Sequence, residues 1–124
     1  MLNRRDYPFL PKAKGPMAHA VIHADSLYIS GLTAMGTDAQ AEDISKQLQE
    51  ILSQLEKVLD HEGRTKSDLI KITIFVKEID KLGIIREALF NFYDSDYPAC
   101  SLVEISNLVH EDLKIEIEAI AAMS

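Results

Sequence analysis

The spacing of apolar residues changes several times along the chain, and two stretches have the period of a helix. The first predicts a long amphipathic helix that Thr37 and Asp38 cap and Gly63 ends. A second helix is expected to begin at a cap on Asp80 and to end before Pro98. The apolar positions are Ile44, Leu48, Ile51, Leu52, Leu55, Val58 and Leu59 in the first helix, and Ile84, Ile85, Ala88, Leu89 and Phe92 in the second.

Other stretches alternate between apolar and polar residues or are short and apolar, which predicts strands. Residues 17–24 and 26–31 flank Asp25 and predict a hairpin. Residues 101–105 and 113–121 predict two strands joined by a polar turn, and residues 1–15 are expected to be irregular. Residues 69–77 predict a half-buried strand, with one face formed by Ile70, Ile72, Ile74 and Val76 and the other by Lys71, Thr73 and Lys77.

The predicted order is β-β-α-β-α-β-β, an α+β arrangement of residues 1–124 as a single domain. Two helices can cover only one face of a single sheet, so the other face needs a partner. Phe75 and Ile120 are apolar residues on otherwise polar strand faces, which predicts a subunit contact there.

The composition narrows the classes of function. A formal net charge of −7 argues against nucleic acid as a partner, because phosphate binding needs a basic face. A single cysteine allows no internal disulfide and indicates a reducing compartment. No apolar run is long enough for a membrane span, and charged residues interrupt the start of the chain. We therefore expect a cytoplasmic protein without membrane or nucleic-acid partners.

Paired carboxylates are the first candidate for chemistry. Glu116 and Glu118 lie on one face of a predicted strand, with Cα atoms about 6.6 Å apart, and such a pair can perform acid–base work. The alternative is a solvated strand face balanced by Lys114. Cys100 is a candidate nucleophile, but Ala99 and Ser101 supply neither a base nor a cation, so packing is the alternative.

No metal or cofactor site is expected. His19 and His23 share a predicted strand face, but their Cα atoms would lie about 13 Å apart, too far for a shared ion. The chain contains no phosphate-binding loop and no dinucleotide fingerprint.

Several short segments spread along the chain form a recognisable set. They are Gly15-Pro16 with Ala20-Val21, Tyr28-Ile-Ser-Gly31, Lys71-Ile-Thr-Ile-Phe-Val76, Pro98-Ala-Cys-Ser101 and Lys114-Ile-Glu-Ile-Glu-Ala-Ile-Ala121. Together these segments resemble the Rid family (RidA, also called YjgF), small proteins that hydrolyse reactive enamines and imines and are also labelled endoribonuclease L-PSP. The final strand matches the family almost letter for letter.

The resemblance implies a chorismate-mutase-like fold and a homotrimer whose sheets form an inner barrel, with ligand pockets between subunits. It implies that Glu116 positions the attacking water and that a backbone group of Leu102 helps to hold this water. Ser30 and Gly31 match the family pattern. Met17 stands where the family has a tyrosine lining the pocket, and Leu32 where it has a glutamine.

The largest departure is Cys100, which stands where active family members have an arginine that binds the substrate carboxylate. Arg86 is the candidate replacement for this cation, and the alternative is a surface arginine paired with Glu87 or Asp80. The resemblance thus predicts hydrolysis of 2-imino or enamine acids, weakened by loss of the arginine. A trimer that binds 2-imino or 2-oxo acids without hydrolysing them is the alternative, and the acidic charge weighs against a ribonuclease.

Overall fold

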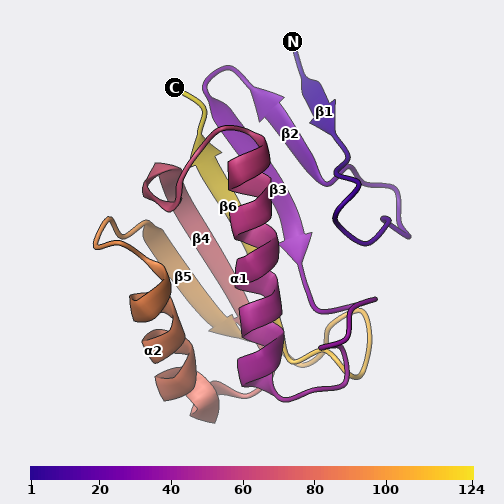
Figure 1. Ribbon diagram of the computed structural model, residues 1–124. Helices are drawn as coiled ribbons and strands as arrows, with labels where there is room; N and C mark the ends of the chain where they lie inside the picture. The colour runs from indigo at the N-terminus through magenta and orange to yellow at the C-terminus, as the bar shows by residue number, and fades with distance from the viewer.

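Six strands form one sheet in the order β1-β2-β3-β6-β4-β5 (Figure 1). The structure, a computed structural model, describes residues 1–124. The strands are β1 (Asn3–Arg5), β2 (Ala20–His23), β3 (Ser26–Leu32), β4 (Leu69–Val76), β5 (Ala99–Glu104) and β6 (Ile115–Ala122). The predicted order β-β-α-β-α-β-β is confirmed, and β1 is an additional strand before it.

The last strand lies in the middle of the sheet. β6 pairs antiparallel with both β3 and β4, while β4 and β5 pair parallel across a helical connection. The expectation that the last two strands are joined by a short polar turn is therefore wrong, because β4 separates β5 from β6 and residues 105–114 connect them. β5 pairs with β4 at the edge of the sheet, and β6 pairs with the other side of β4, so these two consecutive strands are not neighbours.

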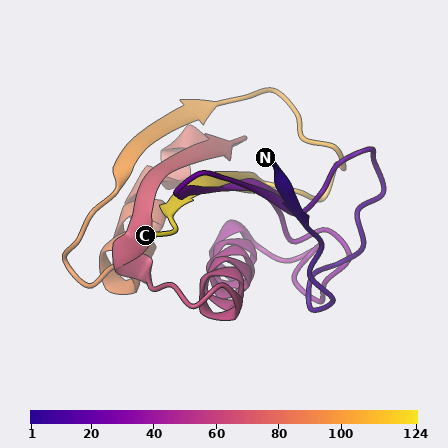
Figure 2. The ribbon, with the colours of Figure 1, turned by 90° about the horizontal axis from the view of Figure 1, so that it is seen from above.

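Both helices cover one face of the sheet, which arches over them in Figure 2. α1 (Ile44–His61) buries every position of its predicted apolar stripe and ends before Gly63, whose φ is +71°. The predicted cap is wrong, since Asp43 caps α1 by accepting a hydrogen bond from the Lys46 amide. The Thr37 hydroxyl instead donates to the Ala34 carbonyl in a preceding turn.

The second helix is shorter and less buried than predicted. Asp80 lies in a 3-10 turn (Ile79–Lys81), so α2 (Leu82–Phe92) begins after it without a side-chain cap. Ile85 is fully buried, whereas Ile84 is 43% exposed and lies outside the core. A further 3-10 turn (Lys66–Asp68) leads into β4.

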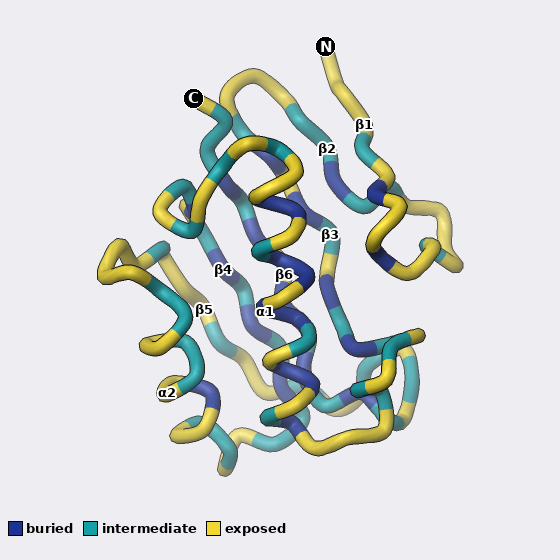
Figure 3. Tube along the Cα trace, viewed as in Figure 1, coloured by how far each residue is buried: buried dark blue, intermediate teal, exposed yellow.

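The buried residues gather between α1 and the central strands, and the edge strands β1 and β5 are largely exposed (Figure 3). A single cluster of 22 buried residues extends from Tyr7 to Ala121. The opposite sheet face carries no helix, as the sequence predicted, and Phe75 and Ile120 lie half-buried on it. No helix of the chain is long and apolar enough to span a membrane.

Two bulges change the register of β6 with its neighbours. Ile70 is an extra residue between the β4–β6 pairs Leu69↔Ala121 and Lys71↔Ile120, and it is 47% exposed. The prediction that Ile70 shares the buried face of β4 is therefore wrong, because the bulge turns its side chain outward. The second bulge lies in β3 between Ile29 and Leu32, at Ser30 and Gly31.

The first residues are more ordered than the sequence predicted. Tyr7 is buried and its hydroxyl donates to a Glu62 carboxylate oxygen 2.6 Å away, at the end of α1. Burial and the neighbouring Glu62 raise the pKa of Tyr7. The His19 ring accepts a hydrogen bond from the Tyr7 amide, and this contact joins the two ends of the loop between β1 and β2.

Candidate functional site

Glu116 and Gly31 meet on the sheet face that no helix covers. Glu116 is the second residue of β6, and its side chain lies on the same face as those of Phe75 and Glu118. The Glu116 carboxylate occupies the space above Gly31, because a Cβ atom built on Gly31 would lie 2.7 Å from Glu116 Cδ. The β3 bulge thus creates a glycine seat for this carboxylate.

Burial makes Glu116 harder to ionise. Desolvation raises its pKa above the ordinary value, and the negative charge of Glu118 raises it further. Glu118 is exposed, so the two carboxylates of the predicted pair occupy different environments. A half-buried carboxylate with a raised pKa can accept a proton and return it, which is what a general base and acid needs.

The segment before β2 supports the glycine seat. The Ser30 hydroxyl donates to the Ala18 carbonyl at 2.7 Å, and the Ser30 amide donates to the His19 carbonyl at 3.0 Å. Met17 lies one residue before this contact and is 57% exposed. The structure therefore brings together Glu116, Gly31 and Ser30, with Met17 close by along the chain.

Cys100 and Leu102 lie on the other face of the sheet. In the β4–β5 pair they stand opposite Ile72 and Ile74, which belong to the core that the helices cover. Leu102 packs against that core, whereas Cys100 is exposed and does not pack as the alternative proposed. Burial, and then the nearby Cys100, raise the pKa of Tyr93 to about 12.

Arg86 is an exposed residue of α2, on the helix-covered side of the sheet. It takes part in none of the ion pairs of the chain, so the suggested pairing with Glu87 or Asp80 is absent. Within one chain, Glu116 therefore has neither Cys100 nor Arg86 on its own side of the sheet.

Two hollows on the surface lie away from Glu116. One of about 180 Å³ is on the uncovered sheet face and is lined by residues that include Lys71, Thr73 and Glu118. Another, of about 460 Å³, lies along residues 6–19 and includes Met17. Because Glu116 lines neither hollow, the site is identified by the chemistry of this carboxylate and not by the size of a cavity. No group of three or more potential ligand side chains is placed to hold a metal ion.

Sequence reasoning missed Gln47 and Gln54, which interrupt the apolar face of α1. Both side chains are buried, and both bind backbone groups near the site. A signal was available, because both residues lie within the helical stripe of apolar positions.

Comparison with known proteins gives a consistent family. The family model described as endoribonuclease L-PSP matches residues 10–123. A 2-iminobutanoate/2-iminopropanoate deaminase of Salmonella typhimurium is 34% identical over 116 residues, covering 90% of each chain. A RutC family protein of Pyrococcus horikoshii is 30% identical over 114 residues, again covering 90% of each.

Solved structures agree with the fold. A protein of the conserved Rid family from Yersinia pestis has a TM-score of 0.89 and 29% identity, covering 98% of this chain and 99% of that one. A yeast protein has a TM-score of 0.91 over the full length of both chains, and at 20% identity it supports the fold alone.

Proposed function

This chain belongs to the endoribonuclease L-PSP family, which includes the Rid proteins, and on that premise we propose that it hydrolyses small 2-imino acids to 2-oxo acids and ammonia. The names of its relatives point to 2-iminobutanoate and 2-iminopropanoate as substrates. The observation that carries the proposal is the half-buried Glu116 carboxylate, with its raised pKa, above Gly31.

Glu116 supplies the proton transfers that the reaction needs. The carboxylate takes a proton from water while the water oxygen bonds to the imine carbon and the C=N electron pair moves to nitrogen. The protonated carboxyl then returns this proton to nitrogen, which gives an amino alcohol. Transfer of the hydroxyl proton to nitrogen through Glu116 lets the C–N bond break, so ammonia leaves and the 2-oxo acid remains.

A neighbouring subunit is proposed to complete the pocket. The uncovered face around Glu116 needs a partner, and the exposed edge strand β5 carries Cys100 and Leu102. A homotrimer would place the neighbour's β5 and α2 beside Glu116. Cys100, the Leu102 backbone and Arg86 would then line the pocket across the subunit boundary from Ser30, Gly31 and Met17.

The protein is expected to be a homotrimer in solution. The physical reason is the uncovered sheet face, on which Phe75, Tyr28 and Ile120 would otherwise contact water. Light scattering at micromolar concentration checks this, and a mass equal to one chain would contradict the proposal.

Cys100→Arg is expected to raise imine hydrolysis. A charge-assisted bond to the substrate carboxylate is worth about 1.5–3 kcal/mol, which corresponds to roughly ten- to a hundredfold in binding. The thiol of Cys100 offers no such bond, and its exposed position leaves room for the longer side chain. The measurement is ammonia release from freshly generated 2-iminobutanoate by both proteins. A folded arginine variant with no gain would contradict the expectation.

Binding of 2-oxo or 2-imino acids without hydrolysis is a second candidate function. It is favoured by Arg86, an exposed cation that takes part in none of the ion pairs of the chain and so has its guanidinium available for a carboxylate. If Arg86 of a neighbour binds the carboxylate, titration with 2-oxobutanoate should show weak binding that Arg86→Ala abolishes. Lys14→Ala is the matched control because Lys14 is another exposed cation. Binding that survives Arg86→Ala unchanged would remove Arg86 from the site.

A further inference from the structure

The helix-covered side of the sheet contains two polar side chains that the proposed chemistry does not use. Gln47 is 0% exposed and Gln54 is 5% exposed, so both side-chain amides lie in the interior of the chain. They are seven residues apart on α1 and therefore share one face of the helix. A buried amide is costly unless its hydrogen bonds are made, so the partners of these two side chains are informative.

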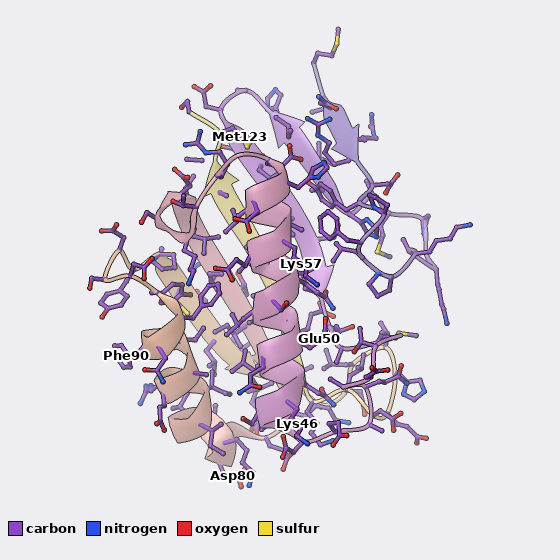
Figure 4. The ribbon with its side chains drawn as sticks, in the orientation of Figure 1. Lys46, Glu50, Lys57, Asp80, Phe90 and Met123 are labelled. Atoms are coloured by element: carbon purple, nitrogen blue, oxygen red, sulfur yellow. The ribbon has the colours of Figure 1, made fainter.

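Gln54 binds the chain directly after β3. Its Nε2 atom donates to the Thr33 carbonyl at 3.1 Å, two residues beyond Gly31. The same nitrogen donates to Glu50 Oε2 at 2.9 Å. Glu50 lies one turn earlier on α1, where Figure 4 labels it. Glu50 thus helps to orient the Gln54 amide toward the end of β3.

Gln47 binds the chain directly before β6. Its Oε1 atom accepts a hydrogen bond from the Lys114 amide at 2.9 Å, two residues before Glu116. Its Nε2 atom lies within hydrogen-bond distance of the Asp112 carbonyl at 2.9 Å and of the Gln40 carbonyl at 2.9 Å. The Gln40 side chain also donates to Asp112 Oδ2 at 3.2 Å, so the loops after β3 and before β6 are tied together.

These contacts begin where the sheet pairing stops. The last registered pair between β3 and β6 is Leu32↔Ile117, and Gly31 and Glu116 lie beside it. Beyond this pair the two strands separate, and their backbone groups need other partners. The glutamine amides take the place of the missing sheet hydrogen bonds on both strands.

We propose that Gln47 and Gln54 are positioning residues of the Glu116 site, because from α1 they fix the backbone of the two strands that bring Glu116 against Gly31. The inference rests on the proposed function of Glu116. Gln47 holds the backbone at the start of β6 and therefore fixes the position of Glu116 relative to β3. Gln54 holds the backbone directly after β3 and therefore fixes the position of Gly31, the glycine seat.

The variants Gln47→Met and Gln54→Met test this inference, since methionine keeps the length of the side chain and removes its hydrogen bonds. Ile51→Val is the matched control, because Ile51 is a fully buried α1 residue between the two glutamines and has no polar group. All three variants are expected to unfold at a lower temperature than the wild type. Stability alone therefore does not distinguish a positioning role.

The deciding measurement is an NMR titration of the Glu116 carboxyl carbon in protein labelled with ¹³C-glutamate. Gln47→Met is expected to move the titration midpoint of the Glu116 carboxyl toward that of an ordinary glutamate. The reason is that the carboxylate moves away from Gly31 and becomes more exposed to water. Gln54→Met should move it in the same direction, and Ile51→Val should leave it unchanged. In 2-iminobutanoate hydrolysis, kcat of the glutamine variants should fall roughly ten- to a hundredfold with KM within about twofold, as expected for a misplaced base.

The two readouts separate this inference from the proposed function. If the Glu116 titration midpoint shifts in the glutamine variants while the wild-type protein releases no ammonia, the positioning role is supported and the hydrolase proposal is overturned. Active wild-type protein with the same Glu116 midpoint and the same kcat in both glutamine variants would overturn the positioning role. An equal shift in Ile51→Val would also overturn it, because general loosening of the core would then explain the effect.

Discussion

Glu116→Gln is expected to reduce hydrolysis of 2-iminobutanoate by about 10²–10⁴-fold, the usual contribution of a positioned general base. Glutamine keeps the shape of the side chain above Gly31 but cannot accept a proton from water. The loss should appear in kcat, since the base acts on water and not on the substrate carboxylate. Ammonia release measured with freshly generated imine checks the expectation.

The same variant should gain stability at neutral pH. Because the folded-state pKa of Glu116 is raised, its contribution to stability is present at low pH and is lost as the pH rises through that pKa. Glu116→Gln removes this loss, so its unfolding temperature should exceed that of the wild type at pH 7 and approach it in acid. Glu118→Gln is the control for activity alone, which should change little because Glu118 is exposed. Full activity in Glu116→Gln would show that this carboxylate is not the base.

Wild-type activity should fall as the pH drops through the raised pKa of Glu116, because protonation removes the base. The acid limb of the pH profile is therefore expected above the range of an ordinary glutamate. This limb reports the same group as the NMR titration, so the two midpoints for the free enzyme should agree.

Gly31→Ala is expected to reduce hydrolysis roughly a hundredfold, the size of effect that a shift of about 1 Å at a reacting group produces. An alanine Cβ would lie 2.7 Å from Glu116 Cδ and even closer to Oε2, so the carboxylate has to move. The φ of Gly31 is not among the positive ones, so the backbone itself accepts alanine. The obstacle is the end of a flexible side chain, and the fold should survive with a small loss of stability.

Gly83→Ala is the matched control for this prediction. Gly83 lies in α2 with no atom within 4 Å of a built Cβ, so alanine should stabilise the helix by about 0.5–1 kcal/mol without affecting activity. Thermal unfolding and imine hydrolysis of both variants give the comparison. Unchanged activity in Gly31→Ala would mean that contact with Gly31 does not place the catalytic carboxylate.

Periodicity found α1 and β6 because each of them buries one face. The α1 stripe is buried throughout, and β6 alternates with Ile115 and Ile117 inside and Glu118 outside, as expected. Periodicity failed at Ile70, where a bulge reverses the side-chain direction, and at Asp80, which a 3-10 turn places outside α2. A single inserted residue changes the face of a strand without changing its composition.

The sequence by itself determined the order and type of the elements, the polar face of β6 and the pairing of the β2–β3 hairpin, because these depend on short-range spacing. It also carried the family motifs that single out Glu116 and Gly31. Only the tertiary structure placed β6 between β3 and β4, which is what sets Gly31 beneath the Glu116 carboxylate. Only the tertiary structure put Cys100 on the helix-covered side, since the face of an edge strand depends on its register with β4. Strand neighbours and register depend on pairing between segments far apart in the sequence, and local spacing does not encode these contacts.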